Sequence, residues 1–276
     1  MVDQYDRIDI SDIPAEQYEQ LGTKFKFWFN SKLGIQELFK EGRLDTGENW
    51  AEKVACELCA LLDLPHATYE LAIWKGRRGV ITPSFVPPEA FLVHGNELLA
   101  KTIRNYPHGK MFGAKEYSLK AVLAIMKAPV FKLPRTWKPF AGFSLPLDVF
   151  IGYLMLDAWI ANQDRHHENW GFLAFPGEGV FLAPTYDHAS GLGRNETDES
   201  RKLRLTTKDH RRTLEFYVQR AKSAFYTSAE PPERVGTLDA FREAGGRRPL
   251  AARAWLERLE ADRKSTRLNS SHTDIS

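Results

Sequence analysis

The sequence contains little of what marks secreted, nucleic-acid-binding or repeat proteins. Only two of its 276 residues are cysteines, and its formal net charge is +2. Two cysteines cannot supply the disulfide framework of a small secreted domain, so the chain needs no oxidising compartment. A net charge this small gives no reason to expect nucleic acid or an anionic membrane as a partner. The sequence also shows no internal repeat.

Long hydrophobic runs are missing as well. The N-terminal residues are acidic and polar, without the apolar segment of a signal peptide. The most apolar stretch, residues 145–161, is interrupted by Asp148 and Asp157, whereas a membrane-spanning helix needs about 18 or more apolar residues in succession. We therefore expect a cytoplasmic protein that has no membrane partner and has access to ATP. Its length suits one bilobal domain, or two lobes that share a cleft.

The chain does contain a polar motif with a distinctive spacing. Asp164 and Asn169 are five positions apart, in the run Asp164-Arg-His-His-Glu-Asn169. Two apolar, strand-like runs follow, residues 170–175 and 180–186, and the second ends directly before Asp187. Because a turn with two glycines separates these runs, we expect a β-hairpin.

The hairpin predicts where Asn169 and Asp187 lie. The midpoint of their positions is residue 178, inside the turn, so the two side chains are expected opposite each other at the open end of the hairpin. Directly opposed residues have Cβ atoms roughly 4.5–5.5 Å apart, which is close enough to share a cation. Mg²⁺ takes one or two carboxylates together with water and substrate phosphates, so these two side chains suit a magnesium site.

Asp164 completes a set of three oxygen-bearing side chains that suits phosphoryl transfer. An Asp on the loop entering the hairpin can orient the attacking hydroxyl, while Asn169 and Asp187 hold Mg²⁺. For Asp164 and Asn169 alone, an ordinary Asx turn at a helix end is the alternative. His166 lies between Asp164 and Asn169, and we assign it an orienting role in this catalytic loop. The other histidines near the motif are expected at the surface or behind the substrate-contacting residues; they are His167, His188 and His210.

The segment before the motif is predicted to support it. Residues 145–161 are largely apolar and have helical spacing. A buried helix there would hold the catalytic loop rigidly from below. The expected stripe on this helix consists of Phe150, Leu154, Ala158 and Ala161, extended by Ile151 and Met155.

Residues 162–169 and 183–187 resemble two motifs of the HipA-like kinases, a bacterial family with a protein-kinase-like fold. In that family an Asp-x-His-x-x-Asn catalytic loop and a downstream Tyr-Asp pair carry these functions. The resemblance implies Asp164 as the catalytic base, Asn169 and Asp187 as Mg²⁺ ligands, and an ATP-dependent kinase acting on Ser or Thr of an unknown protein substrate. It also implies an α+β, bilobal fold.

The resemblance extends upstream and divides the chain. A small β-rich N-lobe over residues 1–86 would bind ATP, and a mainly helical C-lobe over residues 87–262 would carry the catalytic loop. Gly22, Thr23 and Lys24 resemble a phosphate-covering loop, although they do not form a Walker pattern. Lys40 resembles the ATP-contacting lysine. Phe85 and Val86 lie where a strand leads into the adenine-binding hinge.

The carboxylate partner of Lys40 is expected on a helix over residues 48–57. The larger apolar residues of this helix form one stripe, with Glu52 on its far side and Glu57 near its edge; they are Trp50, Val54, Leu58, Leu61 and Leu62. Packing alone cannot choose between the two glutamates, whereas the resemblance favours Glu52. Cys56 and Cys59 on the same helix have no second pair for a zinc site, and we interpret them as free thiols.

Two departures from the family pattern limit the resemblance. The chain begins almost at the phosphate loop, without the extra N-terminal subdomain of the larger HipA toxins, which leaves an antitoxin partner open. Asp187 is followed by His-Ala-Ser-Gly rather than Phe-Gly, so no eukaryotic-type activation loop is implied. Three alternatives stay open: a lipid or small-molecule kinase of phosphoinositide-kinase-like type, a nucleotide-binding pseudokinase, and a metal-dependent hydrolase.

The remaining segments are predicted from simple patterns. Helices are expected over residues 96–104, 118–126, 211–224 and 250–261. Residues 196–212 carry mixed charges and are expected to form a solvated loop beside the acceptor. The last residues, 263–276, are polar, without an amphipathic period, and resemble translated sequencing-adapter sequence. We expect them to be a non-native tail.

Overall fold

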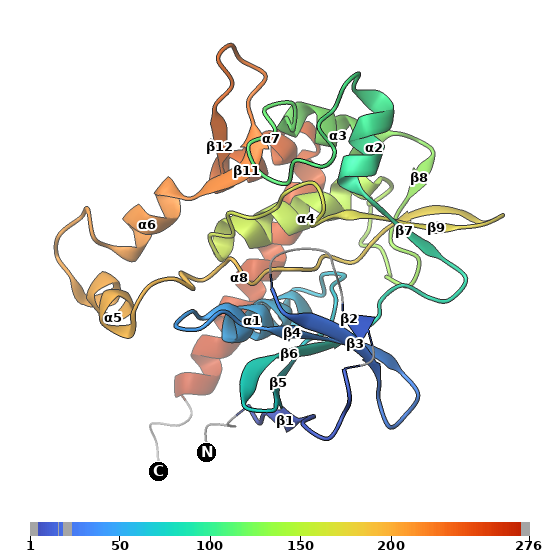
Figure 1. Cartoon of the computed structure of the whole chain (residues 1–276). Helices are drawn as coiled ribbons and strands as arrows, with labels where there is room; N and C mark the ends of the chain where they lie inside the picture. The colour runs from blue at the N-terminus through green and yellow to red at the C-terminus, as the bar shows by residue number, and fades with distance from the viewer. Residues whose placement is uncertain (1–4, 16, 19–23, 272–276) are drawn as a thin grey trace.

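A computed structural model describes residues 5–15, 17–18 and 24–271, with side chains for residues 5–15 and 24–261. The N-terminal part is a β-sheet and the C-terminal part is mainly helical (Figure 1). The sheet has six strands in the order β1-β5-β6-β4-β3-β2. Its strands are β1 Ile8–Asp9, β2 Gln17–Tyr18, β3 Lys26–Asn30, β4 Gln36–Glu41, β5 Glu70–Trp74 and β6 Arg77–Pro83.

Alternation along β3 and β4 gives the sheet two different faces. Phe27 and Phe39 pair across the two strands and are fully buried, with ring centroids 5.3 Å apart. Because successive side chains of a strand point to opposite faces, the neighbouring pair, Lys26 and Lys40, lies on the other face and borders a cavity. One face of the sheet therefore forms an aromatic core, and the other presents lysines.

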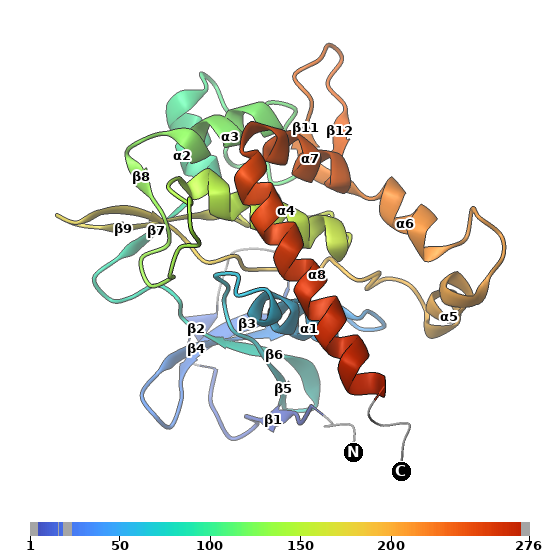
Figure 2. The same cartoon turned by 180° about the vertical axis from the view of Figure 1, so that it is seen from behind.

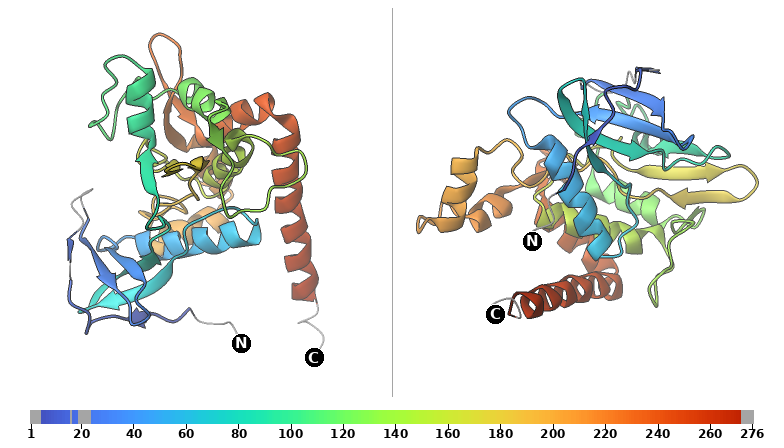
Figure 3. Two further views of the ribbon diagram at one scale, coloured as in Figure 1. Left: turned by 90° about the vertical axis from the view of Figure 1, so that its right-hand side faces the viewer. Right: turned by 90° about the horizontal axis from the view of Figure 1, so that it is seen from below.

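Helix α1 (Glu48–Leu61) lies next to this sheet, and the stripe predicted on it is only partly confirmed, since Leu62 is fully buried and Leu58 packs against the core. Leu61 is more than half exposed, whereas Ala51, Ala55 and Cys59 are fully buried. In both views of Figure 3 the sheet and the long C-terminal helix α8 (Pro249–Ser271) lie on opposite sides of α1. Small residues on the buried face let α1 approach its neighbours closely. The prediction assumed that the largest apolar residues mark the buried face, and here not all of them do.

The C-terminal part is organised around α4 (Pro146–Trp159). Every residue of α4 from Pro146 to Ala158 is buried, so the helix is apolar all round rather than striped. Figure 2 shows α8 crossing the back of the molecule past α4. There Trp255 is fully buried and its indole N–H donates a 2.8 Å hydrogen bond to the carbonyl oxygen of Asp148.

The other C-terminal elements surround this core. The helices are α2 Gly95–Thr102, α3 Leu119–Lys127, α5 Asp198–Thr206, α6 Leu214–Arg220 and α7 Thr237–Arg247. A second sheet has the strand order β7-β9-β10-β8 and a third consists of β11 and β12. Their strands are β7 Phe91–His94, β8 Phe131–Lys132, β9 Gly171–Phe175, β10 Gly179–Leu182, β11 Lys222–Tyr226 and β12 Arg234–Gly236. No helix among the described residues is long and apolar enough to span a bilayer.

The predicted hairpin is present as β9 and β10, but its register differs from the prediction. Gly179 pairs with Phe175 and Leu182 pairs with Phe172. Continued outward, this register would place Asn169 opposite Thr185, two residues before Asp187. Strand pairing therefore does not bring Asn169 and Asp187 face to face, and the loops beyond the hairpin must position them.

Three C-terminal segments also differ from expectation. The helix predicted over residues 211–224 ends at Arg220, and β11 follows because Ser223 and Phe225 alternate into the core. The predicted loop 196–212 contains α5, whose first turn is capped by Thr197, since this hydroxyl accepts the backbone N–H of Ser200 at 3.2 Å. Helix α8 continues to Ser271, into the residues predicted as a non-native tail.

Candidate active site

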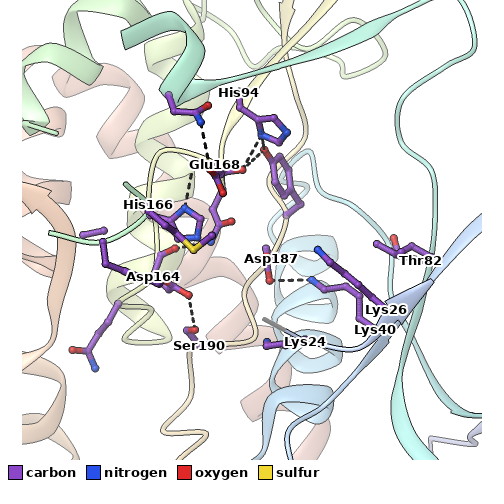
Figure 4. Close-up of a pocket in the computed structure, with 18 of the residues that line it drawn as sticks. Lys24, Lys26, Lys40, Thr82, His94, Asp164, His166, Glu168, Asp187 and Ser190 are labelled. Carbon is purple, nitrogen blue, oxygen red and sulfur yellow. Dashed lines mark hydrogen bonds and ion pairs between the residues drawn. The ribbon is translucent and has the colours of Figure 1, made fainter. Parts of the chain in front are cut away.

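A cavity of about 850 Å³ lies between the N-terminal sheet and the C-terminal part (Figure 4). Its lining includes most of the predicted site residues: Lys24, Lys40, Phe85, Val86, Asp164, His166, Asn169 and Asp187. Glu52 is buried behind Lys40. Gly22 and Thr23 lie outside the described residues. One cavity thus collects side chains that are far apart in the sequence.

Lys40 joins β4 to both α1 and the residues after the hairpin. Its ammonium lies 3.0 Å from Oδ1 of Asp187 and 3.5 Å from Oε2 of Glu52. Glu57 is turned away from the cavity and instead contacts Lys53 at 2.7 Å. The structure therefore places Glu52, and not Glu57, beside Lys40.

Burial and charge act in opposite directions on this group of residues. Burial would lower the pKa of the Lys40 ammonium, but the carboxylates of Asp187 and Glu52 outweigh it and raise that pKa well above its usual value. Burial would likewise raise the pKa of Asp187, but the charges of Lys40 and Lys24 hold it below the ordinary range. Lys40 and Asp187 are therefore both charged near neutral pH.

Lys24 has a different balance. Burial lowers the pKa of its ammonium to about 8, against the opposing charge of Asp187. Its side chain lies 3.0 Å from Glu48, a buried carboxylate at the start of α1 that also contacts Arg43 and Arg194. Lys24 is thus a cation that a nearby phosphate would hold in its charged form.

The backbone at Asp187 is held in an unusual conformation. Its φ is +60°, in the left-handed region that a non-glycine residue rarely adopts. Its N–H donates to the Tyr69 hydroxyl at 3.3 Å, and the N–H of His188 donates to Oε1 of Glu52 at 2.6 Å. These contacts fix the direction of the Asp187 side chain, which suits a site where a ligand requires a set geometry.

Asp164 and Asn169 are connected to each other across the catalytic loop. The amide nitrogen of Asn169 donates a 2.7 Å hydrogen bond to the carbonyl oxygen of Asp164. This bond uses Nδ2 and leaves the amide oxygen, Oδ1, as the atom suited to a hard cation. The Ser190 hydroxyl donates a 3.0 Å hydrogen bond to Oδ2 of Asp164, so a hydroxyl group already lies against the predicted base.

The environment of Asp164 favours proton transfer near neutral pH. Burial, with the nearby charge of Asp187, raises the pKa of Asp164 to about 6, although the hydrogen bond from Ser190 acts against this rise. A carboxylate with this pKa is mostly ionised at pH 7 and accepts a proton more readily than an ordinary aspartate.

A buried ion pair holds the catalytic loop in place. Arg165 is fully buried and contacts Asp157 of α4 through two hydrogen bonds of 2.7 Å. The same guanidinium donates to the carbonyl oxygen of Asn169 at 3.0 Å and to the Thr185 hydroxyl at 2.9 Å. Because one side chain links α4 and both ends of the hairpin, it fixes the loops that carry Asn169 and Asp187.

The histidines occupy buried positions around this network. His166 borders the cavity, and its Nδ1 accepts the backbone N–H of Glu168 at 3.2 Å. Burial lowers the pKa of His166, which keeps its ring neutral near pH 7. His167 and His188 are buried behind the cavity, where their rings hydrogen-bond to Tyr106 and Thr185. The surface placement is therefore wrong for His167 and His188, whereas His210 is exposed as predicted.

The far end of the cavity is aromatic. Phe85 stacks on Tyr186 with ring centroids 5.1 Å apart. The Tyr186 hydroxyl donates to the carbonyl oxygen of Glu168 at 2.8 Å, and Nδ1 of His94 lies 3.1 Å from the same hydroxyl. Phe85 and Val86 therefore border an apolar surface of the kind that a planar base can contact.

The protein ligands available for a cation are few. Among the described residues, no three His, Cys, Asp or Glu side chains are grouped closely enough to hold a metal ion by themselves. Asn169 and Asp187 offer one amide oxygen and one carboxylate to the same cavity. A cation bound there would take its other ligands from phosphates and water, which fits Mg²⁺.

Several residues of this site were not expected from the sequence. They are Asp157, Arg165, Tyr69, Glu48 and Ser190. Arg165 lies inside the motif, and Ser190 follows Asp187 by three positions, but neither position reveals a contact. A polar residue inside the apolar segment 145–161 was the one available signal, because Asp157 could be buried there only with a partner.

Comparison with known proteins identifies the fold. No model of a known protein family matches the chain, and no curated protein matches its sequence. Its structure is similar to the Helicobacter pylori proinflammatory kinase CtkA, with a TM-score of 0.60 and 19% identity over 94% of this chain and 95% of that one. The chain therefore shares the fold of this kinase.

HipA itself is a more distant neighbour. In the complex of Shewanella oneidensis MR-1 HipA with HipB and operator DNA, the TM-score is 0.44 with 14% identity, and the match covers 66% of this chain and 46% of that one. This likeness is too low to carry an argument of its own. The α+β fold class, with a β-rich N-terminal sheet and a helical C-terminal part, is confirmed by the structure and by the likeness to CtkA.

Proposed function

We propose that the protein is an ATP- and Mg²⁺-dependent kinase of the HipA-like type, which transfers the γ-phosphoryl group to a Ser or Thr hydroxyl of a protein. The observation that carries this proposal is the arrangement of three residues in one cavity. Lys40 contacts Asp187 at 3.0 Å, and Asp164 faces the same cavity with a hydroxyl 3.0 Å from its carboxylate. A cytoplasmic location would give this site access to ATP.

Each residue has one task in the proposed reaction. Lys40, positioned by Glu52, holds the phosphates of ATP, and Lys24 covers them from the side of the N-terminal sheet. Phe85 and Val86 contact the adenine. Asn169 and Asp187 hold Mg²⁺, which when bound supplies positive charge to the phosphates.

The chemical step uses Asp164. The acceptor hydroxyl attacks the γ-phosphorus as its proton passes to a carboxylate oxygen of Asp164, and the bond between the γ-phosphorus and the β,γ-bridging oxygen breaks. ADP leaves with the electron pair of that bond. His166, a neutral ring in the same cavity, accepts the N–H of Glu168 and so helps to hold the loop that carries Asp164. Because the pKa of Asp164 is about 6, the proton acceptor is ready at neutral pH.

The proposal is tested by labelling. Purified protein is incubated with Mg²⁺ and γ-labelled ATP, alone and with cell lysate, and labelled species are identified by mass spectrometry. We expect label on serine or threonine of a protein. Label on lipid or small molecules alone would favour a kinase of phosphoinositide-kinase-like type, and tight ATP binding without any product would favour a pseudokinase.

The Asp187→Ala variant tests the metal assignment. We expect turnover to fall by about 10³-fold, because the variant removes charge stabilisation at the transferring group. Asp239→Ala is the control, since Asp239 is exposed on α7 and does not border this cavity. If Asp187→Ala kept the turnover of the wild type, Asp187 would not be a metal ligand.

A further inference from the structure

A second, smaller cavity adjoins the proposed active site. It measures about 280 Å³ and shares Gln163 and Tyr217 with the larger cavity. Gln163 directly precedes Asp164 in the chain. In Figure 4, Lys40 and Asp164 lie on opposite sides of Asp187. The small cavity therefore adjoins the side of Asp164, where the acceptor hydroxyl arrives, and not the lysines of the nucleotide side.

Three arginines border this small cavity, and no acidic residue does. They are Arg204 on α5, Arg211 in the segment between α5 and α6, and Arg220 on α6. Arg204 is neutralised by Glu196 through two hydrogen bonds of 3.1 and 3.0 Å. The guanidinium groups of Arg211 and Arg220 have no carboxylate partner within the described part of the chain. The cavity thus carries two uncompensated positive charges.

The acidic residue Asp209, two positions before Arg211, is already engaged elsewhere. Asp209 accepts the backbone N–H of Arg211 at 2.9 Å, and its carboxylate lies 3.9 Å from the side chain of Arg212. Arg220 lies over the ring of Phe216, 5.5 Å from its centroid, a contact that positions the side chain and leaves its charge in place. Most other arginines of the described chain, such as Arg165 and Arg248, contact a carboxylate, so this pair belongs to a minority.

We propose that this basic cavity binds an anionic side chain of the protein acceptor, next to the hydroxyl that Asp164 activates. This inference rests on the proposed function and gives its substrate class: a protein segment in which a glutamate, an aspartate or a phosphorylated residue flanks the Ser or Thr. Guanidinium groups suit this task because their paired N–H groups match the oxygens of carboxylates and phosphates. Tyr217, shared by both cavities, lies where the two parts of such a segment would meet.

Peptide binding tests the inference without requiring turnover. The probes are three fluorescein-labelled peptides of one length with a single serine, flanked by glutamate, by glutamine or by one phosphoserine. We expect the wild type to bind the glutamate and phosphoserine peptides about tenfold more tightly than the glutamine peptide, and added salt to reduce the difference because the contacts are exposed.

Charge reversal tests whether Arg211 and Arg220 cause the preference for acidic peptides. The Arg211→Glu and Arg220→Glu double variant should lose the preference for acidic peptides, and should phosphorylate the glutamate peptide with a kcat/KM about tenfold lower while its KM for ATP is unchanged. The control is the double variant Arg78→Glu and Arg104→Glu, which makes the same charge change at two exposed arginines that border neither cavity. It should keep the preference of the wild type.

The outcomes separate this inference from the proposed function. Phosphorylation of peptides without any preference for acidic flanks, or a preference that survives in the Arg211 and Arg220 variant, would overturn the basic acceptor site and leave the kinase proposal intact. A charge-dependent binding preference without transfer to any peptide or protein would support the anion-binding cavity and overturn the kinase proposal.

Discussion

The catalytic loop and the segment carrying α5 and α6 border the same cavity but are stabilised in different ways. The loop, residues 162–169, is held by the fully buried Arg165 and its partner Asp157. The arm, which we define as residues 191–220, projects from the body in Figure 1, and its two helices contain no buried residue. Residues proposed for chemistry thus lie on a fixed support, and residues proposed for acceptor binding lie on an exposed one.

The contributions of two ion pairs to stability, one in each region, can be measured and compared. Arg165 with Asp157 and Arg204 with Glu196 are both paired through two hydrogen bonds, but the first pair is buried and the second is about one-quarter exposed. Removing one member of a buried pair leaves an uncompensated charge in the interior, whereas an exposed group is solvated by water. The buried pair should therefore matter far more for stability.

We expect Asp157→Ala to lower the free energy of unfolding by about 3–5 kcal/mol, and Glu196→Ala to lower it by less than about 1 kcal/mol. Urea denaturation of the two variants and the wild type measures both values. Similar losses in the two variants would mean that the catalytic loop does not depend on its buried support.

The comparison between Lys40 and Lys53 isolates the catalytic role of a buried lysine. Each contacts two carboxylates, Lys40 with Asp187 and Glu52, and Lys53 with Glu57 and Glu70, but only Lys40 borders the cavity. Lys40→Met should lower kcat/KM for ATP by about 10²-fold, while Lys53→Met should affect stability with little change in kcat/KM. Equal kinetic losses in the two variants would assign Lys40 a purely structural role.

The pH dependence tests the state of the base. Asp164 acts as a carboxylate, and burial raises its pKa to about 6. Below that pH it becomes protonated, so kcat/KM should fall about tenfold per pH unit as the pH decreases. A pH–rate profile from pH 5 to 8 on the wild type and on Asp164→Asn measures this, and the residual activity of the variant should lack the acidic limb. An acidic limb that persisted in the variant would assign it to another group.

The smallest effect is expected from Ser190. Its hydrogen bond stabilises the ionised form of Asp164 and lowers the pKa of that carboxyl group. Ser190→Ala should therefore move the acidic limb to higher pH and lower kcat about two- to tenfold. Ser228→Ala, in the exposed loop between β11 and β12, is the control and should change neither value. A limb that stayed in place would leave Ser190 without a role in positioning the base.

The sequence predicted the parts of the fold whose signals are local. The apolar segment 145–161 predicted α4. The apolar runs 170–175 and 180–186, separated by a turn with two glycines, predicted the β9–β10 hairpin. The predicted register was wrong because three of residues 176–179 favour a turn, so the sequence cannot show which residue begins the second strand. That Asn169 and Asp187 border one cavity then depends on Arg165, whose hydrogen bonds to Asp157, Asn169 and Thr185 no local sequence pattern predicts.

The other errors also have physical causes. Helix α1 buries alanines and cysteines while Leu61 is exposed, and no pattern within the helix predicts that choice. Helix α5 lacks an apolar face, so periodicity could not detect it, although Thr197 followed by acidic residues was a capping signal. The choice of Glu52 over Glu57 required the orientation of α1 relative to the sheet.

The central claim is that Asn169 and Asp187 together bind the metal that accompanies ATP, with Asp164 beside it. The most direct measurement is anomalous diffraction from crystals grown with Mn²⁺ and a non-hydrolysable ATP analogue. We predict an anomalous peak within about 2.0–2.3 Å of the amide oxygen of Asn169 and a carboxylate oxygen of Asp187, with the γ-phosphate on the side of Asp164. A bound nucleotide whose metal ion touched neither side chain would contradict the claim.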